Sequence, residues 1–540
     1  MKNRSVMQHA FSRVPKVNIP RSVFNRSSGH KTTFDAGWLV PIFVDEALPG
    51  DSMNMRTTFL IRLLSASIRP FMDNLWVDTF WFFVPNRLLW TNFRKFMGEQ
   101  DNPGDSTSFT VPTITGPNVA AGGIPIGHLY DYMGIPTGPL NGGGATTGIT
   151  FDNLHGRAYN LCWNTWFRDQ NLQNSVTVDL GDGPDTFANY NLLRRGKRHD
   201  YFTSALPFLQ KGTAVPLPLG TVAPIIPVSP NLTVPTFTND AGATIHNLVG
   251  NNASTTVRSD SNWAATANMA WANPGLYADL SLATGATINS LRQSITLQQL
   301  LENDARGGTR YIEIIKAHFG VTSPDARLQR PELLSVYSAP LKINPVANTS
   351  SNSALGFAAV GTLGGFGTGV QSGQGFTKSF TEHGVILGII SVRADLTYQS
   401  GLDRMWSRRT RYDYFWPELA NIGEQSILNR EIYANLADGT GASQKDGVFG
   451  YIPRYDEYRF KNSKITGQLR SSAPSTLDIW HLSQNFSSQP TLGSTFIQDD
   501  PPLDRVIAVP SEPHFILDAY FDLKHARPMP VFSVPGLHKL

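Results

Sequence analysis

The pattern of apolar residues near the start of the chain predicts two long β-strands. Residues 53–67 and 74–84 are rich in Thr, Phe, Leu, Trp and Val, and Pro70 and Pro85 bound them. In the second stretch, apolar side chains occupy both odd and even positions, so neither face of the strand is cleanly polar. We therefore expect this strand to be covered on both faces, inside a larger assembly of sheets and loops.

Further strands and several helices are predicted along the chain. Strand composition recurs at 385–390, 392–398 and 514–524. Apolar residues near helical spacing predict helices at 88–97, 152–167, 296–304, 310–319 and 424–433, the third and fourth forming a helical hairpin. Very long connections separate the strands. A two-sheet sandwich of the jelly-roll type accommodates them, because its loops leave from the ends of the sheets.

The composition agrees with a mainly β architecture. Of the 540 residues, 16% are charged, while 47 glycines and 36 prolines predict many turns and few long charged helices. Two nearly uncharged runs, 116–150 with ten glycines and 347–377 with eight, are expected to be long loops. Within the second run, residues 361–369 lack the spacing of a phosphate-binding motif, so we interpret them as a flexible loop.

Residues 212–300 differ in character from the rest of the chain. They consist mainly of Thr, Asn, Ala, Gly and Pro, and only five of them are charged. We predict a surface insertion with Trp263 and Trp271 as candidate contact residues, because aromatic side chains supply binding area at a small entropy cost. The alternative is a decorated loop without a partner.

Positive charge gathers at the N-terminus. The chain carries 45 Lys+Arg against 42 Asp+Glu, a net charge of +3, yet residues 1–34 hold seven bases and no acid. Such an arm favours contact with a polyanion such as nucleic acid; the alternative is a solvated, unstructured terminus without a partner. The candidate DNA-binding residues are Lys2, Arg4, Arg13, Lys16, Arg21, Arg26 and Lys31.

A second basic cluster lies in the body of the chain. Arg194, Arg195, Lys197 and Arg198 stand beside two aromatic residues. Interleaved bases and aromatics can hold single-stranded nucleic acid through phosphate contacts and base stacking. The alternative, which we favour, is that these bases pair with carboxylates at a subunit or loop interface.

Little in the sequence indicates catalysis. Cys162 is the single cysteine, so neither a disulfide framework nor a cysteine zinc site can form within the chain, and a reducing compartment is expected. The sequence contains no nucleotide-binding loop, nucleophile elbow or zinc-protease motif, and its twelve histidines are dispersed without metal-ligand spacing. We therefore expect no catalytic residue, no metal site and no cofactor.

Export and membrane insertion are not expected either. The first residues lack the continuous apolar stretch of a signal peptide, and six prolines interrupt the apolar region 212–239. Two other classes of protein are alternatives to consider for a chain of this composition. A jelly-roll protein acting on glycans would need a convergent acid pair in a cleft, which no motif predicts. An adhesin built from β-sandwiches would be expected to show an export signal and repeats, and neither is recognisable.

Nine long motifs occur in one order over nearly the whole chain. They are ALPGD at 47–51, FVPNRLLW at 83–90, FMGE at 96–99, FRDQNL at 167–172, RRGKRHDYFTSALP at 194–207, VRADLTY at 392–398, RMWSR at 404–408, YDEYRF at 455–460 and RPMPV at 527–531. Together they resemble the major capsid proteins of gokushoviruses, small single-stranded DNA phages of the microvirus group. The sequence departs from this pattern mainly in 116–150, 212–300 and 347–377.

This resemblance implies an eight-stranded antiparallel jelly roll of the viral capsid type, with long loop insertions, a few short helices and no enzymatic activity. It implies a homo-oligomer that assembles through pentamers into a T = 1 shell of sixty copies around circular single-stranded DNA. The implied partners are an internal scaffolding protein, a DNA pilot protein, a small basic DNA-binding protein and a host cell-surface receptor. The chain is expected in the virion, after assembly in the host cytoplasm.

On this basis the chain divides into four parts. Residues 1–34 are the basic arm, facing the shell interior. Residues 35–211 and 301–540 form the jelly-roll core and an extended C-terminal tail. Residues 212–300 form a surface protrusion near the threefold axes, and its two tryptophans are candidate host-attachment residues.

Overall fold

The computed structural model describes the following parts of the chain. They are residues 20–138, 148–213, 215, 225–227, 236–239, 245–250, 257–259, 269–273, 276–278, 288–322, 329–349 and 360–532. The chain forms two compact units. We call the first, Met1–Leu209 with Gly308–Leu540, the body, and the second, Gln210–Gly307, the insertion unit.

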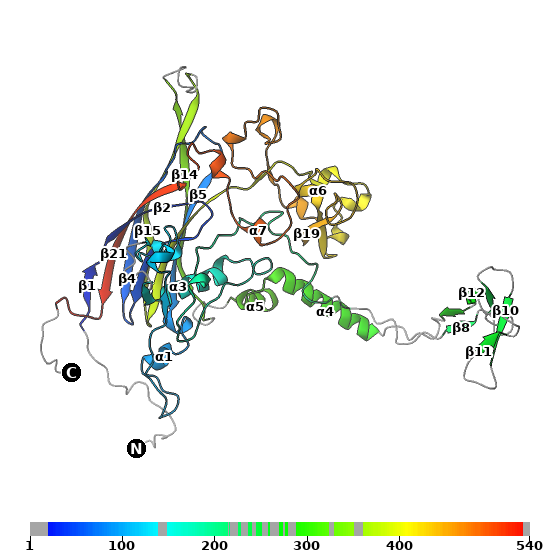
Figure 1. The fold of residues 1–540 in the computed structure, drawn as a ribbon, viewed down its shortest axis with the longest axis horizontal. Helices are drawn as coiled ribbons and strands as arrows, with labels where there is room; N and C mark the ends of the chain where they lie inside the picture. Colours follow the sequence, from blue (N-terminus) through cyan, green and yellow to red (C-terminus); the bar gives the residue numbers. More distant parts are fainter. Residues whose placement is uncertain are drawn as a thin grey trace. The chain divides into compact units, whose positions relative to one another are not determined.

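The body is built on one strongly curled antiparallel sheet of nine strands, whose two halves form a jelly roll (Figure 1). Sheet one has the order β2–β21–β4–β15, with β1 (Ser22–Asn25) also paired to β21, and sheet two has the order β14–β5–β16–β3. The bounds are β2 (Ser28–Phe34), β3 (Val40–Ala47), β4 (Ser52–Leu63), β5 (Leu75–Pro85), β14 (Glu332–Ala347), β15 (Leu363–Ser379), β16 (Gly384–Ala394) and β21 (Phe515–Arg527).

This arrangement confirms the predicted mainly β jelly roll. The strands predicted at 53–67, 74–84 and 514–524 correspond to β4, β5 and β21. Most of the two stretches at 385–390 and 392–398 forms the single strand β16. The long strands β14 and β15 pair with each other and also with β5 and β4, so they join the two sheets.

The space between the sheets is filled by side chains that alternate along each strand. In β4, Met53, Met55, Thr57, Phe59 and Ile61 are buried, while the residues that alternate with them point away from the core. Trp81 of β5 lies in the middle of this core, against aromatic rings from three other strands. This alternation forms one continuous apolar layer, as expected for two packed sheets.

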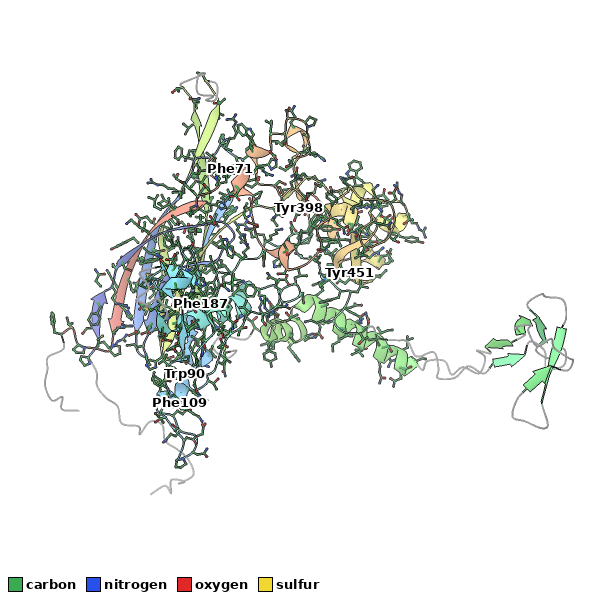
Figure 2. The ribbon with its side chains drawn as sticks, in the orientation of Figure 1. Phe71, Trp90, Phe109, Phe187, Tyr398 and Tyr451 are labelled. Carbon is green, nitrogen blue, oxygen red and sulfur yellow. The ribbon has the colours of Figure 1, made fainter. Side chains whose placement is uncertain are left out.

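The outer face of sheet two is covered by a second apolar layer. Phe80, Phe82 and Val84 of β5 point into it, which confirms that this strand is buried on both faces. The covering side chains come from the long connection after β5, and Figure 2 shows Trp90 and Phe187 among them. The connection contains α1 (Phe93–Phe96), β6 (Thr113–Thr115), α2 (Leu129–Tyr132), β7 (Thr150–Asp152) and α3 (Leu154–Cys162).

The helices of the body are short. The helix predicted at 152–167 is α3 continued by a π-helical turn, Trp163–Phe167, and the one predicted at 310–319 is α5 (Tyr311–Phe319). The helix predicted at 88–97 is confined to one turn, α1. The other elements of the body are β17 (Thr397–Tyr398), β18 (Glu424–Leu428), α6 (Asn429–Ile432), β19 (Val448–Pro453), β20 (Ser463–Lys464) and α7 (Ser494–Ile497).

Two predictions of local structure were wrong. Most of 424–433 is not a helix, because Gln425 and Ile427 point inward alternately in a hairpin between β18 and β19. The glycine run within 347–377 is not a loop from Leu363 onward, because it forms β15 in the interior of the curled sheet. A side chain at Gly367 would meet Leu63 and Leu341 at 2.7 and 2.8 Å, so core side chains pack directly on this backbone.

The insertion unit combines small sheets and one long helix. Its helix α4 (Ile288–Gly307) has 20 residues and begins eight residues before the helix predicted at 296–304. Trp263 lies outside the described residues, and Trp271 lies in β12. The strands are β8 (Ile225–Pro227), β9 (Thr236–Asn239), β10 (Ile245–Gly250), β11 (Val257–Ser259), β12 (Met269–Asn273) and β13 (Leu276–Ala278).

Candidate assembly and nucleic-acid surfaces

The described end of the basic arm is part of sheet one. Residues 22–25 and 28–34, which the sequence suggested as part of a free arm, form β1 and β2 and pair with β21. The physical reason is that β21 would otherwise present an edge of unpaired backbone groups, which these two strands satisfy. The arm prediction is therefore wrong for residues 22–25 and 28–34, and residues 1–19 lie outside the described part of the chain.

Arg26 is held by a cluster of charged groups at this edge. Its guanidinium donates to both carboxylate oxygens of Asp45, at 2.6 and 3.0 Å, and lies 3.0 Å from Nδ1 of His525. Nε2 of His525 lies 2.9 Å from Asp51, which also accepts a hydrogen bond from Arg527. Burial lowers the pKa of His525, so the neutral ring can accept a hydrogen bond from Arg26.

The other arm bases have different surroundings. Lys31 Nζ lies 3.5 Å from a carboxylate oxygen of Asp518, and both side chains are largely exposed. Arg21 donates to the hydroxyl of Ser52 at 2.9 Å. Four arm bases lie outside the described residues; they are Lys2, Arg4, Arg13 and Lys16.

The outer face of sheet one is polar and exposed over the middle of β4 and β21. Tyr520 is 52% exposed there, next to Thr58 of the neighbouring strand. Four bases and two acids point outward on this face, which we call the open face. They are Lys31, Arg56, Arg62, Lys524, Asp518 and Asp522. The excess of bases makes the open face mildly attractive to anions.

The second basic cluster is engaged within the body. Arg195 donates to the buried carboxylate of Asp78, and Arg393 donates to the same carboxylate at 3.0 Å. Although burial alone would raise the pKa of Asp78, the two guanidinium groups hold it below its usual value. Arg195 itself is 9% exposed, so it offers almost no surface to a partner.

The remaining three bases of this cluster also contact the same chain. Arg194 lies 2.8 Å from Asp500 and covers the ring of Trp38 at 4.3 Å. Arg198 lies 3.1 Å from Asp395, and Lys197 donates to Gln484 at 2.8 Å. The partners thus come from other loops and strands of the body, which stabilises the contact between the long connections and sheet two.

One acid in this region is buried without an ion pair. Asp499 is 3% exposed, and its Oδ2 has no hydrogen-bond partner within the described chain. Burial raises the pKa of Asp499 to about 7, although Lys197, Arg393 and Arg195 pull it in the opposite direction. Lys197 is buried as well, and this lowers its pKa to about 8. The two groups interact, and their titration ranges overlap.

We expect Asp499 to make the stability of the body depend on pH. Its pKa is higher in the folded than in the unfolded chain, so its contribution is full below pH 4 and is lost as the pH rises through 7. The loss is at most about 1.4 kcal/mol per pH unit. Asp499→Asn should remove this slope, which urea unfolding at pH 4.5, 6 and 7.5 would measure. The same slope in the variant and the wild type would contradict the assignment.

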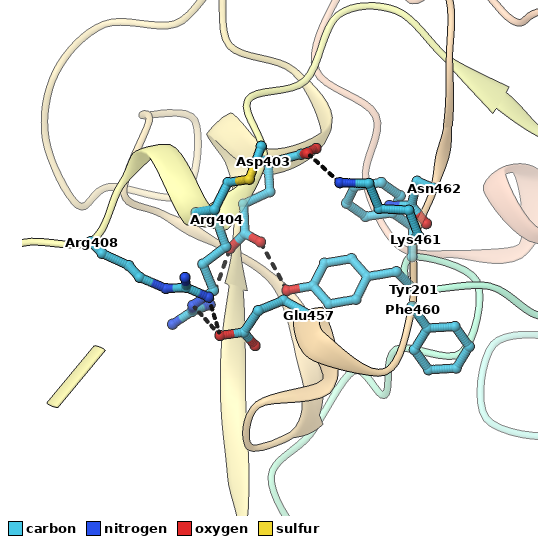
Figure 3. Close-up of a pocket in the computed structure, with 11 residues that line it drawn as sticks. Tyr201, Asp403, Arg404, Arg408, Glu457, Phe460, Lys461 and Asn462 are labelled. Carbon is cyan, nitrogen blue, oxygen red and sulfur yellow. Dashed lines mark hydrogen bonds and ion pairs between the residues drawn. The ribbon is translucent and has the colours of Figure 1, made fainter. Parts of the chain in front are cut away.

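A polar pocket lies where α6 meets the segments 403–408 and 457–462 (Figure 3). Tyr201 donates to the buried carboxylate of Glu431 at 2.8 Å, and Arg404 contacts the same group at 3.1 Å. Burial raises the pKa of Glu431, while Arg404 opposes the shift. Arg408 lies 3.6 Å from the second acid, Glu457.

The small volume of this pocket and the ion pairs made by its acidic residues argue against catalysis. Its volume is about 70 Å³, far below the roughly 300 Å³ at which small-molecule sites begin. Glu431 and Glu457 both face Arg404, so the convergent acid pair that a glycan hydrolase needs is neutralised here. Among the described residues, no group of three or more His, Cys, Asp or Glu is placed to hold a metal ion. Likewise, none of the helices in the described ranges is long and apolar enough to cross a membrane.

Several charged residues of the body were missed by sequence reasoning. Asp51 and His525 are 474 positions apart, and Asp78 and Arg195 are 117 apart. Asp51, Asp78 and His525 carry no sequence signal of their partners, and only the tertiary fold brings the partners together. The sequence does contain one signal of a surface site: four arginines and five aromatic residues lie between positions 404 and 416.

A jelly roll with long insertions and a basic N-terminus, whose charged clusters stabilise its own loops, defines a structural coat protein. Comparison with known proteins identifies which one. The family model described as Capsid protein (F protein) matches residues 12–537. Capsid protein VP1 of Bdellovibrio phage phiMH2K is 48% identical over 98% of both chains, and that of Chlamydia phage 1 is 42% identical over 99% of both. Capsid protein VP1 of Spiroplasma virus 4 is 37% identical over 98% of both chains.

The chain belongs to this family of phage capsid proteins and is the major capsid protein of a microvirus. The gokushovirus resemblance of the sequence motifs is thereby confirmed. The protein is a structural component of the virion shell and not an enzyme.

Proposed function

We propose that sixty copies of this chain form a T = 1 shell around circular single-stranded DNA, with pentamers as assembly intermediates. The jelly roll supports this, because loops of very different length leave the ends of its sheets and can make the distinct contacts that icosahedral symmetry requires. The proposed partners are an internal scaffolding protein, a DNA pilot protein and a small basic DNA-binding protein, with assembly in the host cytoplasm.

The observation that carries the DNA part of the proposal is the position of the arm. Ser22 of β1 lies opposite Arg527 of β21, so the arm enters the body at the edge of sheet one. Residues 1–19 hold four bases and no acid. The open face, on the same sheet, carries two more bases than acids. We therefore place the arm and the open face toward the genome.

The insertion unit is the proposed protrusion near the threefold axes and the proposed host-attachment surface. Its support is its separate compact fold and its composition, which is polar but nearly free of charge over 212–300. Trp263 and Trp271 are the proposed receptor contacts, since aromatic side chains dominate binding energy at many protein surfaces.

The arm is tested by removing the four bases that precede the described residues. Replacing Lys2, Arg4, Arg13 and Lys16 with alanine should leave the shell at the protein mass of sixty copies of 59.4 kDa, or 3564 kDa. The nuclease-protected DNA per particle should fall. If all four bases contact phosphate, the log–log salt slope of single-strand binding should decrease by about 3 per chain. Light scattering and DNA quantification after nuclease treatment measure both outcomes.

The matched control removes four bases from the body. Arg94, Lys95, Lys316 and Lys342 are not in the arm, and their replacement with alanine should leave the protected DNA unchanged. Arg26 is unsuitable for either set because its loss would also break the cluster with Asp45 and His525. Equal DNA content in arm variant and wild type would contradict the role of the arm.

A further inference from the structure

The connection between β16 and β21 exposes an unusual number of aromatic side chains. The most exposed of them is Trp406, at 66%. Together they make up what we call the aromatic patch: Trp406, Tyr412, Tyr414, Phe415, Trp416 and Tyr458. Single exposed apolar residues are common on soluble proteins, but six aromatic residues in one short region are not.

The loop that carries the patch is held in one conformation. The carboxylate of Asp413 accepts hydrogen bonds from the backbone N–H groups of Arg409 and Thr410, at 2.9 and 2.7 Å. It also accepts from the hydroxyl of Thr410 at 3.0 Å. These bonds lower the pKa of Asp413 and close the turn that presents the following aromatic residues. A partner would therefore meet a loop that is already ordered.

Neighbouring side chains of the body contact the patch and restrict its movement. Phe415 contacts the rings of Tyr455 and Tyr458, with centroids 5.2 and 6.3 Å apart. Arg454 donates to the backbone oxygen of Tyr412 at 3.1 Å. Because these contacts fix the exposed side chains, binding costs little conformational entropy.

Some of the cations beside the patch are engaged within the chain. Arg404 is paired with Glu431. The guanidinium of Arg408 lies over the rings of Tyr414 and Tyr458, at 5.2 and 4.5 Å, and so covers faces on which a base would stack. Glu457 pairs with the same guanidinium. Arg409 and Arg411 are exposed beside these rings, so the covered ring faces, and not a lack of cations, disfavour the stacking of single-stranded nucleic acid.

The exposed area of the patch matches a protein partner. Taking about 200 Å² for a fully exposed aromatic side chain, its six residues present on the order of 600 Å². One partner of a standard protein interface buries about 800 Å². Tyr, Trp and Arg are also the residue types that concentrate binding energy in such interfaces.

We infer that the aromatic patch is a contact with a second copy of this chain in the shell. The inference rests on the proposed function only in that the shell has many symmetry-related neighbours; it does not depend on the number of copies or on DNA. Trp406 and Tyr414 provide the principal anchors, because they are the most exposed members of the patch.

Hydroxyl-radical footprinting with mass spectrometry tests the inference on the full chain. Oxidation of Trp406, Tyr414 and Trp416 is compared among unassembled chain, shells without DNA and shells with DNA. We expect at least fivefold slower oxidation in both kinds of shell. Protection only in filled shells would overturn the inference in favour of nucleic acid. Oxidation at the unassembled rate in every state would overturn it in favour of a surface exposed on the particle.

Paired variants provide a second readout. Tyr414→Ala should reduce the yield of closed shells at least tenfold at equal protein concentration, while the soluble chain keeps its thermal midpoint. Tyr311→Ala is the matched control, because this residue of α5 is similarly exposed and belongs neither to the patch nor to the open face. Equal shell yields for both variants would overturn the inference. Particle mass and protected DNA, measured on the same samples, report separately on the proposed function.

Discussion

Replacing Arg157 with alanine is expected to lower the free energy of unfolding by about 3–5 kcal/mol. The guanidinium makes two hydrogen bonds to Asp185, at 2.8 and 2.5 Å, and a third to the backbone oxygen of Leu89 at 3.0 Å. Both side chains of the ion pair are essentially inaccessible to solvent. The alanine variant would leave the carboxylate of Asp185 buried, with only Asn153 and Tyr190 as partners.

Urea unfolding of the unassembled chain measures this effect. Arg94→Ala is the matched control: it removes the same group from an ion pair with Glu99 in which Arg94 is 65% exposed. The control should change the free energy of unfolding by less than about 1 kcal/mol. A similar small change for both variants would show that the Arg157–Asp185 pair does not hold the parts of the long connection together.

Replacing Gly375 with alanine is expected to destabilise the body by about 3 kcal/mol, at the upper end of overpacking effects. A Cβ at this position would lie 2.0 Å from the backbone oxygen of Met55. No side-chain rotation relieves a collision with backbone, so β15 would have to move away from β4 next to its register shift between Ser372 and Gln374. The backbone hydrogen bonding between β15 and β4 in sheet one would therefore weaken.

Gly29→Ala is the control for this substitution. Gly29 is also in sheet one, but the nearest atom to its added Cβ would be 3.7 Å away, an ordinary contact. Thermal unfolding of the unassembled chains should show a clear drop in midpoint for Gly375→Ala and almost none for Gly29→Ala. If both variants have the same thermal midpoint as the wild type, the close approach of β15 to β4 is not needed for stability.

The sequence by itself determined the class of the fold and the identity of its main strands. The apolar pattern at 53–67 and 514–524 became β4 and β21, and the two-sided pattern at 74–84 became the doubly covered β5. Such patterns are local, because the period of a strand decides which side chains point inward. The ordered motifs also identified the family, since they extend over nearly the whole chain.

Local composition misled where the neighbours of a segment decided its structure. The glycines of 363–377 indicated a loop, yet this segment is β15, because side chains of the adjacent strands fill the space above its backbone. The bases at 26 and 31 indicated a free arm, but the edge of β21 pairs with this stretch. β1 and β2 lie hundreds of residues from β21, and β15 pairs with the equally distant β4 as well as with its neighbour β14.

Only the tertiary structure decided what the charged and aromatic residues contact. Arg195 reaches Asp78 across 117 positions, so the sequence could favour carboxylate partners over DNA for this basic cluster but could not say which carboxylates they are. Conversely, the aromatic residues after position 404 could have belonged to a core, but the fold leaves them at the surface. Ion pairing and exposure depend on distances between segments, and those distances are set by strand topology rather than by the residue types themselves.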